Sequence, residues 1–325
     1  MKWGILGTSF ISGVMAEAIK QDNQSELYAV AGRSESSLAA FAKQYGIANT
    51  FTDYDALLSD EQVDIIYIAL PNHLHHDFII KAAQQGKAIL CEKSLSIDMD
   101  KTELALKAVK DHQVFFAEGL MYLHHPLIHE LVATLESGEI GELRSIHTSY
   151  IASIAQFVNP DSKGAIYNLG CYPVSLVYLV VKTLLGEDAF ANRSLKAISR
   201  RGADNNICET TLLMSFGDQH TATAHTAEDH GLKHHFTILG SKGCITMKSN
   251  PWLPAQDNQF SVEIYETTER DVTVTAEGDA FLYQVRQVRH AVEAGQKELL
   301  SPCANWQDSH NIMQLLTEWE SLGDA

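Results

Sequence analysis

The chain has few of the features that would suit it to a membrane or to nucleic acid. No stretch approaches the roughly 18 uninterrupted apolar residues that predict a transmembrane helix. Basic residues are scarce, with 24 Lys and Arg against 41 Asp and Glu and a formal net charge of −17. Nucleic acids and anionic membranes both require basic surface, so the sequence predicts neither as a partner.

Cysteine is also sparse, and its positions show no metal-ligand spacing. The five residues Cys91, Cys171, Cys208, Cys244 and Cys303 are an odd, scattered set, typical of reduced thiols in a cytoplasmic protein. The N-terminus enters a strand directly, without the apolar segment of a signal peptide. His129-Glu130 begins a His-Glu-x-x-His pattern, but position 133 is Ala, so we expect no metal.

The first 120 residues alternate short apolar runs with stretches of helical period. Such alternation predicts a doubly wound parallel sheet, and 325 residues at about 150 per domain predict two domains. The expected strands are 2–6, 27–31, 63–69, 88–91 and 114–117. The expected helices are 11–20, 35–45, 74–85 and 98–111, the last with Asp98 as its N-cap.

Beyond residue 120 the pattern changes to that of an α+β domain, so we place the two domains at 1–120 and 121–325. A helix is expected near 127–137, and a second, irregular at its start, between Ala165 and Leu185. Alternating runs predict a large, open, mostly antiparallel sheet. These runs are 143–155, 194–200, 207–216, 219–226, 233–239, 243–248, 259–265 and 270–275. Helices near 279–294 and 303–321 end the chain.

A glycine turn follows the first strand and resembles the start of a dinucleotide-binding βαβ unit. Gly7, Ser9 and Ser12 occupy the three positions of the Gly-x-Gly-x-x-Gly fingerprint. Small residues at such a turn let backbone amides approach a pyrophosphate at a helix N-terminus. An ordinary strand-to-helix connection would look the same, so the turn alone leaves both interpretations open.

The end of the second strand favours the phosphorylated cofactor. Gly32-Arg33-Ser34 stands where an acidic residue would bind the ribose 2′-hydroxyl of NAD. Arg33 and Ser34 instead offer donors that suit the 2′-phosphate of NADP. Arg33 could be only a solvated loop residue, and Glu35 could still reach a ribose, so NAD stays possible.

Two later strands end in residues that suit a nicotinamide site. Leu70-Pro71-Asn72 and His75 follow the third expected strand, and Glu92-Lys93 ends the next. Ligands of parallel sheets bind at these carboxyl ends. Taken alone, Glu92-Lys93 is typical of a solvated ion pair.

Together, these motifs resemble one family. Gly-x-x-Gly-x-Ser near the start, Ala-Leu-Pro-Asn-x-x-His at 69–75, Cys-Glu-Lys at 91–93 and Ser-Gly-Glu-Ile-Gly-Glu at 137–142 are similar to the glucose–fructose oxidoreductase, inositol dehydrogenase and rhizopine-catabolism (Gfo/Idh/MocA) oxidoreductases. The resemblance implies an N-terminal Rossmann domain, a C-terminal domain with an open sheet, and oxidation or reduction of sugars, cyclitols and diols with NAD or NADP.

The resemblance also implies roles for individual residues. Lys93 matches the lysine that orients the reacting oxygen and assists proton transfer. Asn168 and Tyr172 fall on a substrate-binding segment, and Tyr172, in a position often held by His, is similar to the dihydrodiol dehydrogenase-like branch, where it is the acid/base. A phenol has a reference pKa near 10, so it would need a nearby cation such as Lys93. Without the resemblance, Tyr172 would be interpreted as a packed aromatic.

Three residues depart from the family pattern. Ser94 stands where proline usually follows the lysine, Asn168 replaces a carboxylate, and Ser9 replaces a glycine that faces the pyrophosphate. Ser94 removes a fixed backbone angle, Asn168 keeps hydrogen bonding without charge, and Ser9 adds bulk. These departures motivate one alternative, a catalytically silent NADP(H)-binding sensor.

The sequence therefore predicts an NADP-preferring oxidoreductase that moves hydride between nicotinamide and a CH–OH or carbonyl carbon of a sugar, cyclitol or diol. A reductase of keto sugars or dicarbonyls is the same machinery in reverse. An exposed apolar sheet face in the region 194–275 predicts a homodimer or larger homo-oligomer. The expected catalytic residues are Lys93 and Tyr172, and Asn168 is expected to bind substrate. The expected cofactor contacts are Gly7, Thr8, Ser9, Phe10, Ile11, Gly32, Arg33, Ser34, Leu70, Pro71, Asn72, His75, Glu92 and Lys93.

Overall fold

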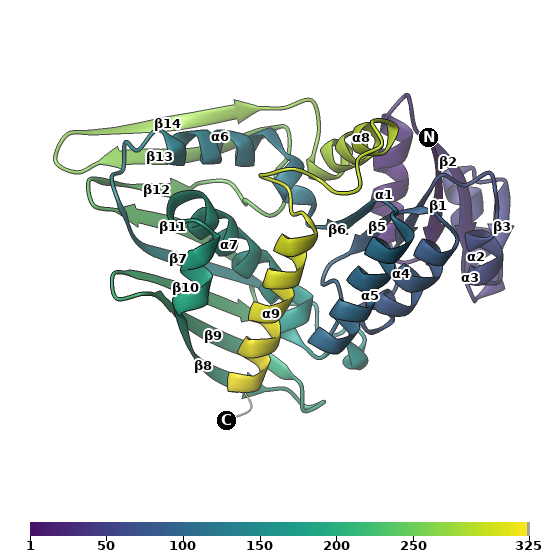
Figure 1. The fold of residues 1–325 in the computed structure, drawn as a ribbon, viewed down its shortest axis with the longest axis horizontal. Helices are drawn as coiled ribbons and strands as arrows, with labels where there is room; N and C mark the ends of the chain where they lie inside the picture. Colours follow the sequence, from purple (N-terminus) through teal and green to yellow (C-terminus); the bar gives the residue numbers. More distant parts are fainter. Residues whose placement is uncertain (324–325) are drawn as a thin grey trace. The chain divides into compact units, whose positions relative to one another are not determined.

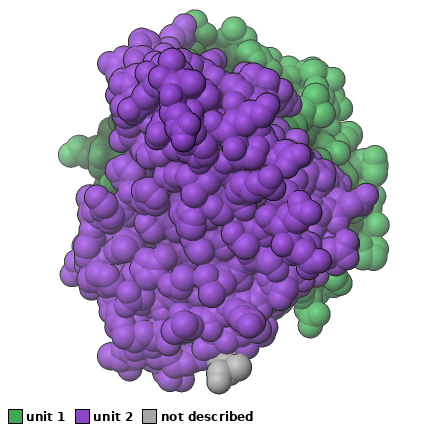
Figure 2. Space-filling model, turned by 90° about the vertical axis from the view of Figure 1, so that its left-hand side faces the viewer, with its two compact units in different colours: residues 1–121, 281–310 green, residues 122–280, 311–325 purple. Residues whose placement is uncertain are grey.

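The computed structural model describes residues 1–323 and divides the chain into two compact units (Figure 2). The first unit comprises residues 1–121 and 281–310, and the second comprises residues 122–280 and those from 311 onward. Sequence analysis placed all of 121–325 in one domain, so the return of 281–310 to the first unit differs from that expectation.

The returning segment covers the edge of the first sheet. The Phe116 N–H donates to the Lys297 carbonyl at 3.0 Å, and the Trp306 indole donates to the Phe116 carbonyl at 3.3 Å. Arg289, buried, donates to the carboxylate of Asp22 at 2.8 Å. An unpaired edge strand is open to unwanted pairing, and the two contacts at Phe116 cover β6, whereas Arg289 fixes the segment to the end of α1.

The first unit is built on a six-stranded parallel sheet, which confirms the predicted doubly wound fold. The strand order is β3-β2-β1-β4-β5-β6. The strands are β1 (Lys2–Leu6), β2 (Glu26–Ala31), β3 (Asn49–Phe51), β4 (Ile65–Ile68), β5 (Ala88–Glu92) and β6 (Phe116–Gly119). The helices are α1 (Phe10–Gln21), α2 (Glu35–Tyr45), α3 (Tyr54–Leu58), α4 (His75–Gln84) and α5 (Met99–His112).

Local sequence explains most of these elements. The Asp98 carboxylate accepts from the Lys101 N–H at 2.8 Å, which confirms the predicted N-cap of α5. Sequence analysis missed β3 and α3, which have only three and five residues. Elements this short show too little periodicity to stand out from a loop.

The second unit is built on an open eight-stranded sheet, mostly antiparallel as predicted. Its order is β14-β13-β12-β11-β7-β10-β9-β8, and only β7 and β10 pair in parallel. The strands are β7 (Leu143–Ala152), β8 (Arg193–Arg201), β9 (Ile207–Phe216), β10 (His220–Ala227), β11 (Leu232–Gly240), β12 (Gly243–Met247), β13 (Asp257–Ile264) and β14 (Thr268–Thr275). Helices α6 (Pro126–Glu136) and α7 (Cys171–Leu185) pack on this sheet (Figure 1).

Two C-terminal helices complete the chain. Helix α8 (Ala280–Glu293) lies almost wholly in the first unit, whereas α9 (Trp306–Gly323) places residues 306–310 in the first unit and the rest in the second. Within the second unit, the Trp319 indole donates to the Thr210 hydroxyl at 2.9 Å and so fixes α9 on the sheet.

The other face of the second sheet is polar, which corrects the expectation of an exposed apolar face. Alternate residues of its central strands are Ser, Thr and His, among them His147, Thr223 and His225. Their side chains hydrogen-bond across strands: His147 lies 3.1 Å from Thr223, and His225 lies 2.9 Å from Thr211. The predicted period-two alternation is confirmed. The uncovered positions, however, carry mostly hydroxyls and imidazoles, with individual apolar exceptions such as Ile198.

The irregular helix start predicted between Ala165 and Leu185 is confirmed as a π-helical turn, Ile166–Gly170, that continues directly into α7. By length and composition alone, Ile166–Leu185 could cross a membrane. Most of its side chains are buried inside the structure, as expected for the core helix of a globular unit.

Candidate active site

The carboxyl ends of β1 and β4 meet at the point where the strand order of the parallel sheet reverses. Ligands of doubly wound sheets bind in the crevice at such a switch point. Gly7 follows β1 and has φ +104°, and a Cβ there would lie 2.8 Å from the carbonyl oxygen of Ala69. Only glycine fits this close approach of the two loops.

The N-terminus of α1 keeps backbone donors for an anion despite the missing glycines. Ser9 and Ser12 form a reciprocal capping box, in which each hydroxyl accepts from the other residue's N–H at 3.4 and 3.1 Å. The Ser9 hydroxyl is thereby turned back onto the helix, and Ser12 is fully buried. The N–H groups of Phe10 and Ile11, in the first turn, remain for a pyrophosphate, so this turn fits a dinucleotide.

The end of β2 also fits the phosphorylated nucleotide. A Cβ at Gly32 would lie 3.0 Å from Thr8 Cγ2, so the chain passes closely over the glycine turn. Arg33 and Ser34 are exposed, and Ser34 is the N-cap of α2, accepting from the Ser37 N–H at 3.4 Å. The guanidinium is therefore available to a phosphate at a second helix N-terminus.

The His75 ring contacts the segments that follow β4 and β5. Its ring is 1% exposed, with Nδ1 2.8 Å from the Ser94 carbonyl and Nε2 2.7 Å from the Leu70 carbonyl. Burial lowers its pKa to about 4, against the two carbonyl contacts, which favour the protonated ring. The ring links the loop after β4 to the segment after Lys93. Contact between His75 and the cofactor stays a prediction.

Lys93 is half-buried beside two buried carboxyl groups. Burial raises the pKa of Glu92, against the short hydrogen bond (2.5 Å) that Tyr67 donates to it and the charge of Lys93. Glu118, from β6, accepts from the Leu95 N–H at 3.0 Å, and burial raises its pKa to about 7. These contacts hold the segment after Lys93 although Ser94 replaces the usual proline.

Glu118 is a site residue that sequence analysis missed. Its Oε2 is sealed from solvent without a hydrogen-bond partner among the described residues. A signal was present, because Glu118 is a charged residue in an otherwise apolar strand, one position from its carboxyl end.

In the second unit, Asn168 and Tyr172 lie on consecutive turns. Asn168 belongs to the π-turn, and Tyr172 is the second residue of α7. The Tyr172 ring packs edge-on against Tyr150, with ring centroids 5.3 Å apart, and the Tyr172 carbonyl accepts from the Trp252 indole at 2.9 Å. π-turns inside helices are frequent at functional sites, and here one separates the two predicted residues.

Asn168 has a carboxylate partner that the sequence did not reveal. Its side-chain amide donates to Glu228 Oε2 at 2.8 Å, and Glu228, which follows β10, is 3% exposed. Burial raises the pKa of Glu228. The negative charge that Asn168 lacks is therefore supplied by a neighbour, although no local pattern marked Glu228.

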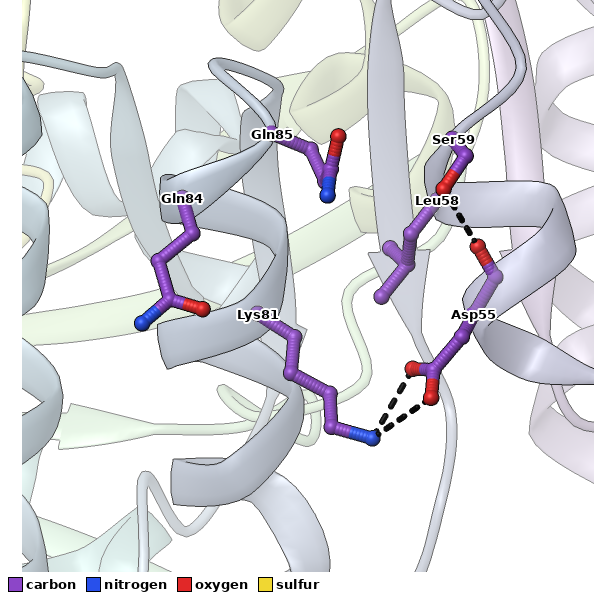
Figure 3. A pocket seen from close by; sticks show the side chains of 6 residues that line it. All are labelled: Asp55, Leu58, Ser59, Lys81, Gln84 and Gln85. Atoms are coloured by element: carbon purple, nitrogen blue, oxygen red, sulfur yellow. Dashed lines mark hydrogen bonds and ion pairs between the residues drawn. The ribbon is translucent and has the colours of Figure 1, made fainter.

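A hollow elsewhere on the first unit offers no comparable chemistry. It lies between α3 and the end of α4, at the amino ends of the strands (Figure 3). Its Lys81 ammonium donates to both oxygens of Asp55 at 2.8 and 2.9 Å. Its one cation is thus already paired. Among residues 1–323, no group of three or more His, Cys, Asp or Glu is arranged to hold a metal.

Comparison with known proteins agrees with this geometry. Residues 1–120 match the model of an oxidoreductase family with an NAD-binding Rossmann fold, and residues 128–246 match the GFO/IDH/MocA C-terminal domain. The chain belongs to the GFO/IDH/MocA family. As a member it is an NAD(P)-dependent oxidoreductase, which confirms the predicted fold, enzyme class and cofactor class.

Several GFO/IDH/MocA proteins are similar along nearly the whole chain. An NADP-dependent D-xylose 1-dehydrogenase from Haloferax volcanii is 28% identical over 97% of this chain and 95% of its own. A trans-1,2-dihydrobenzene-1,2-diol dehydrogenase from Xenopus laevis is 27% identical over 99% and 98%. A 3-ketoreductase from Actinomadura kijaniata, crystallised with NADP and TDP-benzene, has the same fold, with a TM-score of 0.87 at 24% identity over 99% of this chain and 97% of its own.

Proposed function

We propose that this protein transfers hydride between NADP(H) and a CH–OH or carbonyl carbon of a sugar, cyclitol or diol. The observation that supports this most directly is Lys93, held among buried carboxyl groups at the carboxyl end of a strand of the dinucleotide-binding sheet. The names of its relatives, a sugar dehydrogenase, a diol dehydrogenase and a ketoreductase, agree with this substrate class.

The cofactor supplies or accepts the hydride, and the chain supplies binding and proton transfer. The amides of the α1 N-terminus, with Gly7, Thr8 and Ser9, bind the pyrophosphate, while Gly32, Arg33 and Ser34 bind the adenosine end. Leu70, Pro71, Asn72, His75 and Glu92 surround the nicotinamide. These assignments rest on the carboxyl-end location of each segment in the sheet.

Lys93 and Tyr172 act on the reacting oxygen. The Lys93 ammonium donates a hydrogen bond that orients this oxygen, and the Tyr172 hydroxyl passes its proton. Asn168 holds a neighbouring group of the substrate.

The test is a panel of aldoses, cyclitols and diols with NADP⁺ or NAD⁺, and of keto sugars with NADPH, followed by the absorbance of the reduced nicotinamide. Lys93→Met should remove nearly all turnover while leaving the Kd for NADPH within a few-fold. Lys110→Met, which removes an exposed cation from α5, is the matched control and should behave as the parent. Tight nucleotide binding by a parent that turns over nothing would support a silent NADP(H) sensor instead.

We further propose a cytoplasmic homodimer or larger assembly. The five cysteines are free, and the uncovered sheet face is broad and regular. Because that face is polar, pairing would rest on Thr, Ser and His contacts more than on apolar burial. Thr223→Arg at its centre should shift the mass measured by light scattering to that of a monomer, and a monomeric parent at micromolar concentration would contradict the proposal.

A further inference from the structure

Glu228 is a buried carboxylate whose backbone is fixed on both sides. Its N–H donates to the Cys208 carbonyl at 2.9 Å, and its carbonyl accepts from the N–H groups of Ile154 and Ala155 at 2.8 and 2.9 Å. Its side chain is 3% exposed and accepts from Asn168. One donor leaves most of the acceptor capacity of a carboxylate unused, because its two oxygens offer about four lone-pair sites.

Asn168, the hydrogen-bond partner of Glu228, lies in an irregular helical turn. Asn168 lies in the π-turn Ile166–Gly170, and its N–H donates to the Gly164 carbonyl at 3.0 Å. Strand β10 packs against this turn: a Cβ at Gly170 would lie 3.5 Å from Thr226 Cγ2. Glu228 directly follows β10, and its hydrogen bond with Asn168 places its side chain against the same turn that Thr226 contacts.

Tyr172 follows Asn168 by four residues along the same continuous helix. Asn168 thus lies about one turn before Tyr172, at the junction of the π-turn with α7. Its amide links the Glu228 carboxylate to the segment that carries both residues proposed to contact substrate.

We propose that Glu228 is a substrate-binding residue and that, with Asn168, it recognises two adjacent hydroxyl groups of a neutral polyol. This inference rests on the proposed function of Asn168 and Tyr172. Two hydroxyls on neighbouring carbons donate in parallel to the two oxygens of a carboxylate, which the Asn168 amide orients. A substrate hydroxyl would also replace the hydration that burial of this carboxylate removes.

The surrounding charge narrows the substrate class. Asp204 and Asp229 act on Glu228 in the same sense as burial, so the local field is negative. Arg200, the neighbouring cation, is already paired with Asp229 and Glu209. A phosphate or carboxylate bound at Glu228 would be repelled, which favours uncharged sugars and diols over sugar acids and phosphates.

The test compares two isosteric substitutions in the second unit. Glu228→Gln removes the charge and keeps an acceptor for Asn168. Glu320→Gln is the matched control. Glu320 also accepts a hydrogen bond from the π-turn, but the donor is the Tyr167 hydroxyl, at 2.7 Å, instead of Asn168. Calorimetry with the NADP⁺-saturated protein measures binding of D-xylose, D-glucose, myo-inositol and trans-1,2-cyclohexanediol, with cyclohexanol as the single-hydroxyl probe.

We expect at least one vicinal diol to bind the parent, and its Kd to rise tenfold or more in Glu228→Gln but less than threefold in Glu320→Gln. Cyclohexanol binding should change equally little in both variants. The double variant Asn168→Asp/Glu228→Gln, which moves the charge to position 168, should recover part of the diol affinity. A merely structural carboxylate would instead lower Tm and weaken all probes alike.

Equal diol affinity in the parent and Glu228→Gln, or no diol binding to the parent, would overturn this inference. The proposed function would still stand if the parent turned over a sugar, cyclitol, diol or keto sugar with NADP(H) at a rate that Glu228→Gln left unchanged. Conversely, diol binding that depends on Glu228 in a protein without hydride transfer would support this site and contradict the proposed function.

Discussion

The two sheets differ in the burial and the hydrogen-bond partners of a carboxyl group at a strand end. In the parallel sheet, Glu118 lies in a strand whose residues are all buried, and its Oε2 has no hydrogen-bond partner within residues 1–323. In the open sheet, Glu228 follows a strand that alternates buried and half-buried residues, and an amide donates to it. The first arrangement shifts protonation next to Lys93, and the second leaves acceptors for a ligand.

The carboxyl groups of the two units therefore lie in different dielectric surroundings, and each is suited to a different task. A sheet covered on both faces makes charge costly, so burial raises the pKa of the two carboxyl groups beside Lys93. In the open sheet, a carboxylate just past a strand end meets the amide of a turn that packs on the covered face, which leaves acceptors for hydroxyls.

Removing the Tyr172 hydroxyl should abolish the contribution of the second unit to proton transfer. Tyr172→Phe keeps the ring packed on Tyr150 and should lower kcat by roughly 10²–10⁴, the usual value of a positioned acid/base. The Kd for NADPH should not change. Tyr150→Phe, which deletes a hydroxyl from the adjacent ring, should keep kcat within a few-fold, and equal losses in both variants would mean that the aromatic packing matters instead.

Glu118 should make the first unit less stable as pH rises. Its pKa is about 7 when folded, above the 4.5 of an exposed glutamate, so the folded state holds a proton that the unfolded state has lost. The free energy of unfolding should therefore fall between about pH 4.5 and 7 by roughly 3 kcal/mol from this group, at about 1.4 kcal/mol per pKa unit.

His75 acts in the opposite sense, because its folded pKa of about 4 lies below 6.5 and its contribution is lost as pH falls. The measurement is therefore the difference in free energy of unfolding between the parent and Glu118→Gln, by urea titration at pH 4.5 and 7. Glu118→Gln should gain on the parent as pH rises. A difference that stays constant with pH would contradict the buried-carboxyl account.

Substitution by alanine should destabilise the protein more at Gly7 than at a glycine that has a positive φ but no close neighbour. Gly46→Ala, at φ +73° with nothing within 4 Å of the new Cβ, should cost about 1–2 kcal/mol from backbone strain alone. Gly7→Ala adds a clash with the Ala69 carbonyl and should cost roughly 1–3 kcal/mol more. It should also weaken NADPH binding, whereas Gly46→Ala should not, as thermal unfolding and fluorescence titration would show.

Arg33 should give the smallest effect, because it is exposed. Arg33→Ala removes a charge-assisted partner of the 2′-phosphate and should weaken NADPH by about 1.5 kcal/mol, roughly tenfold, with NADH little affected. Lys43→Ala, an exposed cation at the other end of α2, is the control for net charge. A parent that prefers NADH would contradict the assignment.

The sequence alone determined the parts of this protein that depend on neighbours along the chain. Period-two and helical patterns located most strands and helices within a few residues, and the glycine turn with Lys93 identified the cofactor sheet. The sequence showed the departures at Ser9 and Ser94, but it did not show which contacts compensate for them. Ser12 and Ser9 cap one another, and His75 and Glu118 hold the segment after Lys93.

Tertiary structure decided what depends on residues far apart in the chain. Glu228 meets Asn168 across 60 positions, and Leu95 meets Glu118 across 23. The return of 281–310 to the first unit, and which face of the open sheet the helices cover, also depend on packing between distant segments. Local pattern shows which positions alternate, but only the register between strands shows which side chains then meet, and burial sets the charge they can hold.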